Sequence, residues 1–62
     1  MNLYVGSKYV VDAFVENDIL KEGDIVTCIA VDPIFNIYGE FMDQHGFTHR
    51  LFLYDLLEEV VE

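Results

Sequence analysis

The residues of this chain that could do chemistry are one cysteine, two histidines and many carboxylates. Cys28 lies within an apolar run, where a thiol is expected to be a small buried hydrophobic group rather than a nucleophilic thiolate. His45 lies in a predicted loop and His49 in the predicted strand that follows it, so the two do not share one face of a helix. Zinc normally takes four protein ligands, or three and a water, and we therefore expect no metal site.

No spacing in the sequence pairs a nucleophile with a base. Ser7, Thr27 and Thr48 have no candidate base at a sequence spacing typical of a catalytic motif. The glycines are scattered singly and do not form a phosphate-binding loop. A carboxylate pair for acid–base work needs a cleft, for which 62 residues leave little volume. We expect a protein that is not an enzyme and binds no cofactor.

Acidity is the strongest compositional signal, with 12 Asp and Glu against 3 Lys and Arg and a formal net charge of -9. This charge repels phosphate backbones, so direct binding of nucleic acid is not expected. Carboxylates near both ends of the chain, Asp12, Glu16, Glu58 and Glu59, are expected to share one side and to contact a partner with a basic surface. The alternative is that the acidity only keeps the chain soluble, and this is favoured over specific imitation of DNA.

A second candidate contact surface is aromatic. Tyr38, Phe52 and Tyr54 alternate with the apolar positions expected in the core, so they are either exposed as interface anchors or turned into a second core face. For so small a domain the second core face is the favoured prediction.

The single cysteine excludes an intramolecular disulfide and fits a reducing compartment. The sequence shows no signal-peptide pattern, and no apolar stretch is long enough to span a membrane. We expect a cytoplasmic protein that does not contact membranes.

Short β-branched and aromatic runs separated by turn residues predict strands at 8–16, 24–31, 35–42 and 47–54. Gly39 predicts a bulge or bend, and the loop at 43–46 predicts a hairpin. In the tail, Asp55 is expected to cap a short turn through Leu56 and Leu57 before a last strand at 60–61; one longer helix from Asp55 is the alternative.

These elements predict one all-β domain over residues 1–62, with 1–7 as an N-terminal extension. The expected architecture is a small five-stranded SH3-like barrel with a short 3-10 turn before the last strand. The residues expected in its core occupy the apolar positions of the strands and the terminal turn: Val11, Val26, Ile29, Phe41, Leu51 and Leu56.

Three segments carry a resemblance to a known group: LKEGDIVTCIAVD at 20–32, IYGEFMD at 37–43 and LFLYDLLEEV at 51–60. Together they resemble short acidic SH3-like β-barrel proteins encoded by bacteriophages, over about residues 8–61. The resemblance implies an accessory protein that acts in the cytoplasm of an infected bacterial cell.

The leading functional hypothesis is a protein-binding module that modulates a host protein. Two alternatives stay open: an inhibitor that imitates DNA and occupies a nucleic-acid-handling enzyme, and a structural protein that self-associates through an exposed sheet edge, giving a homo-oligomer. Folds of this type host unrelated functions, so the fold alone does not decide among them.

Overall fold

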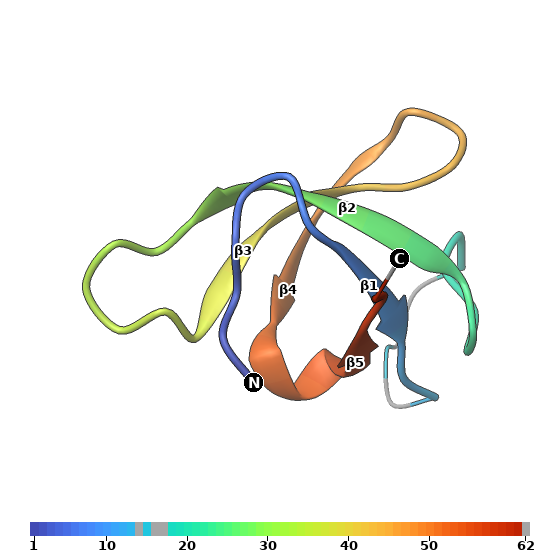
Figure 1. The fold of residues 1–62 in the computed structure, drawn as a ribbon. Helices are drawn as coiled ribbons and strands as arrows, with labels where there is room; N and C mark the ends of the chain where they lie inside the picture. Colours follow the sequence, from blue (N-terminus) through green and yellow to red (C-terminus); the bar gives the residue numbers. More distant parts are fainter. Residues whose placement is uncertain (14, 16–17, 62) are drawn as a thin grey trace.

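The computed structural model of the chain describes residues 1–13, 15 and 18–61. The all-β prediction is confirmed: five antiparallel strands form one sheet in the order β4-β3-β2-β1-β5 (Figure 1). In chain order the elements are β1 (Lys8–Val11), β2 (Ile25–Val31), β3 (Tyr38–Met42), β4 (Thr48–Phe52), the 3-10 turn η1 (Leu53–Asp55) and β5 (Leu56–Glu59).

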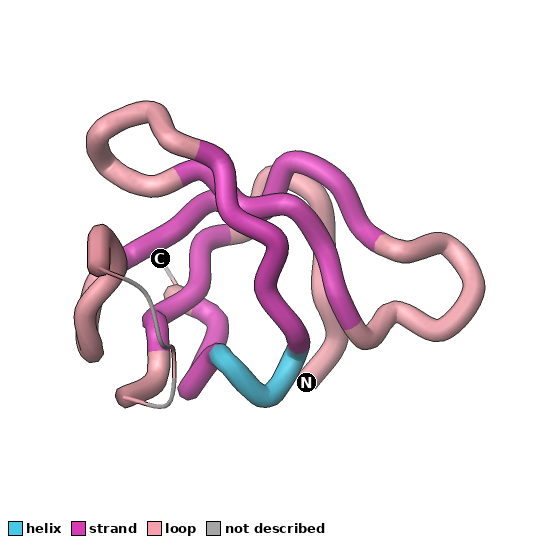
Figure 2. Tube along the Cα trace, turned by 180° about the vertical axis from the view of Figure 1, so that it is seen from behind, coloured by secondary structure: helices cyan, strands magenta, loops and turns pink. Residues whose placement is uncertain are grey.

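The sheet is not closed into a barrel, and the prediction of a barrel is wrong in this respect. Closure needs a hydrogen-bonded ladder between the two outermost strands. Among the described strands, β4 pairs only with β3 and β5 only with β1, and η1 joins β4 to β5 instead (Figure 2). The sheet therefore keeps two edges.

The C-terminal elements lie earlier in the chain than predicted. The 3-10 turn ends at Asp55 instead of starting there, and the last strand is Leu56–Glu59 rather than 60–61. The reason is that the Asp55 carboxylate accepts the backbone N–H of Phe52 at 2.8 Å, which closes the turn before Asp55 and not after it. The alternative of a longer helix from Asp55 is wrong for the same reason.

The predicted strand at 24–31 corresponds to β2, and the one at 47–54 to β4 in its middle part, since residues 53 and 54 belong to η1 instead. The predicted strand at 35–42 begins only at Tyr38. The first predicted strand, 8–16, ends at Val11; its positions 14 and 16 lie outside the described residues.

The core consists of nine buried apolar residues, which come from all five strands and from two segments outside them: Leu3, Tyr9, Val11, Leu20, Val26, Cys28, Phe41, Leu51 and Leu56. Tyr9 and Phe41 meet edge to face with ring centroids 5.8 Å apart. Five of the six predicted core residues are confirmed, and Ile29 is the exception, because 42% of its surface is exposed.

Ile29 faces away from the core because it follows the buried Cys28 and neighbours on a strand point to opposite faces; a bulge begins at this position. Cys28 pairs with Phe41 and Ala30 pairs with Glu40, so Ile29 is an extra residue that faces no partner of its own. The alternation of β2 changes phase there, and Val31 rather than Ala30 packs against the core. The bulge predicted at Gly39 is not found there: Gly39 pairs regularly with Val31 and Leu51, and the extra residue lies in β2.

The first seven residues, expected as an extension, pack onto the sheet. The hydroxyl of Tyr9 accepts the N–H of Tyr4 at 2.8 Å and lies 3.2 Å from the carbonyl oxygen of Asn2. The side chain of Asn36 accepts the N–H of Leu3 and donates to its carbonyl. These bonds hold Leu3 in the core, and the N-terminus lies beside η1 in both views (Figure 1, Figure 2).

Candidate protein-interaction surface

The β3–β4 hairpin fixes which side chains meet on the outer face of the sheet, the face opposite the core. Its loop is ordered by Asp43, whose Oδ1 accepts the N–H groups of His45 at 2.8 Å and Phe47 at 3.0 Å. Gly46 has a positive φ of 89°, which a glycine adopts without strain in this turn. The resulting register pairs Tyr38 with Phe52 and Glu40 with Arg50.

Tyr38, Phe52 and Tyr54 form a continuous aromatic row along this face. The centroids of Tyr38 and Phe52 are 6.0 Å apart, and the rings of Phe52 and Tyr54 are stacked at 5.4 Å with 4° between their planes. Phe52 is 39% exposed and Tyr54 69%, while Tyr38 is half-buried. The favoured prediction of a second core face is wrong, since these rings lie on the sheet face opposite the core; the structure brings them together as an exposed row.

A cross-strand ion pair flanks the aromatic row. Nε of Arg50 donates to Oε1 of Glu40 at 3.0 Å, and the guanidinium carbon lies 5.6 Å from the ring centroid of Tyr38. Arg50 is the single arginine of a chain with net charge -9. The aromatic row and this ion pair therefore form a locally neutral patch on an acidic molecule.

The sequence analysis missed Glu40 and Arg50 as members of this surface. The hairpin itself was the signal that could have found them. Once the loop at 43–46 sets the register, Glu40 must face Arg50 just as Tyr38 faces Phe52.

His49 lies on the opposite, core-facing side of β4 and forms a buried pair with Asp43. Its Nε2 is 2.7 Å from Oδ2 of Asp43, with the two side chains 8% and 4% exposed. This hydrogen bond from His49 lowers the pKa of the Asp43 carboxyl, and the N–H groups of Phe47 and His45 act in the same direction, while burial opposes them. The pair stabilises the hairpin that carries the aromatic row.

The predicted acidic cluster is brought together only in part. β1 pairs with β5, so that Tyr9 faces Glu59 and Val10 faces Glu58. Because neighbours on a strand point to opposite faces, Glu58 and Glu59 do not present their carboxylates on one side. Asp12 follows β1 and is half-buried, and Glu16 lies outside the described residues.

The described residues hold no group of three or more His, Cys, Asp and Glu side chains placed to bind a metal ion. Cys28 is buried, and this burial raises the pKa of its thiol, which disfavours the thiolate. Its Sγ lies 3.4 Å from the carbonyl oxygen of Ala30.

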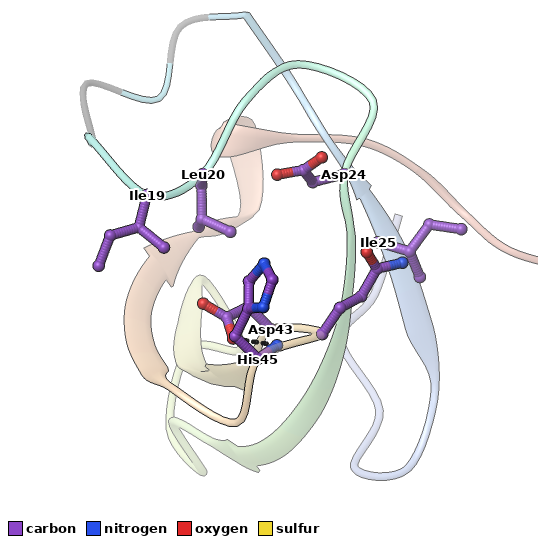
Figure 3. Close-up of a pocket in the computed structure, with 7 residues that line it drawn as sticks. Ile19, Leu20, Asp24, Ile25, Asp43 and His45 are labelled. Atoms are coloured by element: carbon purple, nitrogen blue, oxygen red, sulfur yellow. Dashed lines mark hydrogen bonds between the residues drawn. The ribbon is translucent and has the colours of Figure 1, made fainter.

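Small hollows lie on the surface of the described residues. One hollow of about 60 Å³ lies between the loop that precedes β2 and the hairpin loop, where Leu20, Asp24 and His45 are among the lining residues (Figure 3). A hollow of about 180 Å³ adjoins the aromatic row and is lined by Ala30, Pro33 and Tyr38, among others. Both are smaller than the roughly 300 Å³ at which small-molecule sites begin.

No protein-family model, curated protein sequence or solved structure matches this chain. Within the described part of the chain, no helix is long and apolar enough to cross a membrane. What the chain does must therefore be argued from the surface itself.

Proposed function

We propose that this protein is a binding module that recognises another protein through the aromatic row of Tyr38, Phe52 and Tyr54. The observation that carries the proposal is the stacked and exposed pair Phe52 and Tyr54 beside the neutralised Arg50. Aromatic and arginine side chains are enriched among the residues that contribute most of the binding energy at protein interfaces.

The acidic remainder of the surface supports a partner with positive charge. A net charge of -9 attracts a basic partner at long range, and the aromatic row then supplies the short-range contact. The long-range attraction and the aromatic contact differ in salt dependence. Salt screens the attraction between exposed charges but leaves the free energy of burying the rings almost unchanged.

We further propose that the chain is an SH3-like accessory protein of bacteriophage type that modulates a host protein in the bacterial cytoplasm. The support is the resemblance of residues 8–61 together with the strand order and a 3-10 turn ahead of the last strand. Imitation of DNA has less support, since Glu58 and Glu59 point to opposite faces.

The test is affinity capture from bacterial lysate followed by measurement of binding to the purified partner. The double variant Phe52→Ala, Tyr54→Ala should weaken that binding about tenfold or more. The matched control is Phe35→Ala, which removes a phenylalanine that is 72% exposed on the β2–β3 loop. Equal binding by the two variants would refute the aromatic site.

A further inference from the structure

β4, which carries part of the aromatic row, is an edge strand of the sheet. β4 ends the sheet order, and none of the described strands pairs with its outer side. A strand in that position presents hydrogen-bonding groups that another chain can use.

The phase of the β3–β4 ladder identifies these groups. Leu53 N–H donates to Ile37 O at 2.7 Å, and Asp43 N–H donates to Phe47 O at 2.9 Å. Backbone groups in an antiparallel strand alternate between its two sides, so the N–H and C=O groups of Thr48 and Arg50 point away from β3.

The N–H of Phe52 also points away from β3, as this alternation requires, and Phe52 is the last residue of the free edge of β4. Its N–H is taken by the Asp55 carboxylate rather than by β3. Thr48 and Arg50 are both exposed, and on the outer face they stand beside Phe52. A strand added here would lay every second side chain along the aromatic row.

We propose that the partner contributes an extended segment, net positive and aliphatic at alternate positions, that adds to β4 as a sixth strand. This inference rests on the proposed function and specifies how the surface around the aromatic row binds its partner. Aromatic rings on one strand favour β-branched residues on the neighbouring strand. Main-chain bonds to Thr48 and Arg50 supply the remaining contact.

Charge selects this occupant over a second copy of the chain. Two copies joined edge to edge would bring together molecules that each carry a net charge of -9, whereas a basic segment is attracted. Arg50 does not repel such a segment strongly, because Glu40 neutralises it at 3.0 Å.

The probe is a capped heptapeptide of alternating lysine and valine, titrated into the protein and followed by NMR. The expected result is saturable shifts over Thr48–Phe52 and slower hydrogen exchange at the amides of Thr48 and Arg50, which point away from β3. A peptide with N-methyl groups on alternate residues of its pairing edge should bind about tenfold more weakly, and a glutamate–valine peptide should not bind.

The matched protein variants are Thr48→Pro and Thr48→Val. Proline is tolerated on an edge strand where its missing N–H faced solvent, so Thr48→Pro should keep the thermal midpoint and lose about tenfold in peptide affinity. Thr48→Val keeps the N–H and should bind like the parent chain. Circular dichroism spectra of both variants check that Thr48→Pro and Thr48→Val fold alike.

Three results would overturn strand addition. They are the absence of shifts at β4, shifts that neither N-methylation nor Thr48→Pro reduces, and protection of the Thr48 and Arg50 amides that grows with protein concentration, which would mean self-association. If Thr48→Pro still binds the captured partner while Phe52→Ala, Tyr54→Ala does not, the proposed function stands without strand addition. If the aromatic double variant also binds, the proposed function itself fails.

Discussion

At the scale of single residues, Ile29 and Phe41 show how burial and not hydrophobicity sets the cost of a substitution. Phe41 is fully buried against Tyr9, whereas Ile29 is the exposed extra residue of the β2 bulge. Phe41→Ala should lower the free energy of unfolding by about 3–5 kcal/mol, and Ile29→Ala by less than about 1 kcal/mol. Urea unfolding of both variants checks this, and a larger loss for Ile29→Ala would restore the predicted central position of Ile29 in the core.

Asp43 makes the hairpin sensitive to acid. Its pKa is lowered from the ordinary value of 3.8, so its contribution to stability is complete above that value and is lost as the pH falls through the folded-state pKa. Asn is a neutral stand-in for the protonated side chain. Asp43→Asn should therefore lower the urea midpoint near neutral pH, and the gap to the parent chain should narrow as the pH falls below 3.8. A gap that stays constant across this range would show that ionisation of Asp43 does not matter.

At the scale of elements, the contact between β2 and β3 depends on Gly39. A Cβ atom at Gly39 would collide with the backbone carbonyl oxygen of Ala30, and a backbone atom cannot turn aside as a flexible side chain can. Gly39→Ala should cost about 1–3 kcal/mol, as overpacking does in a closely packed site. Met42→Ala, at an exposed position of the same strand, is the control and should cost well below that in the same thermal melts.

The sequence was informative where a local rule decides the structure. The hairpin at 43–46 follows from Gly46 and Asp43, and the alternation of β1, β3 and β4 correctly predicts Val11, Phe41 and Leu51 in the core. Local rules fail where contacts distant in sequence decide. The bulge at Ile29 arises where β2 faces β3 close to Gly39, and no pattern within β2 reveals it.

The exposure of the aromatic row belongs to the same class of failures. Alternation correctly separates Phe52 from Leu51, but it does not tell whether a second layer covers the outer face of the sheet. In the structure the outer face is uncovered at this point, so Phe52 and Tyr54 remain at the surface. The members of this candidate site could thus be read from the sequence, while their accessibility could not.

At the scale of the whole molecule, the carboxylates near the chain ends lie mostly away from the aromatic row. The row lies beside the ion pair of Glu40 and Arg50, and Asp55 adjoins it by accepting the N–H of Phe52, whereas Asp12, Glu58 and Glu59 lie where β1 pairs with β5. In this arrangement long-range attraction and short-range contact come from different parts of the chain. Each part can then be altered without the other.

The last prediction uses that separation. The double reversal Glu58→Lys, Glu59→Lys should slow association with the captured partner more than Asp18→Lys, Glu22→Lys, which changes the net charge equally. The reason is that pairing of β1 with β5 adds Asp12 and Asp55 to the local field of Glu58 and Glu59. Glu58, Asp18 and Glu22 are exposed and Glu59 is half-buried, so both variants should fold, with slightly higher thermal midpoints at low salt as self-repulsion falls.

Asp32 and Asp43 are unsuitable as controls for this experiment. Both are buried and accept backbone N–H groups, so their reversal would unfold loops rather than only change charge.

Association rates are measured at two salt concentrations, where the difference between the double variants should fall as screening increases. Equal slowing by both would mean that the whole acidic surface attracts the partner without a preferred side. If neither double variant slows association, the aromatic row alone determines binding, and the carboxylates at the paired termini have no part in attracting the partner.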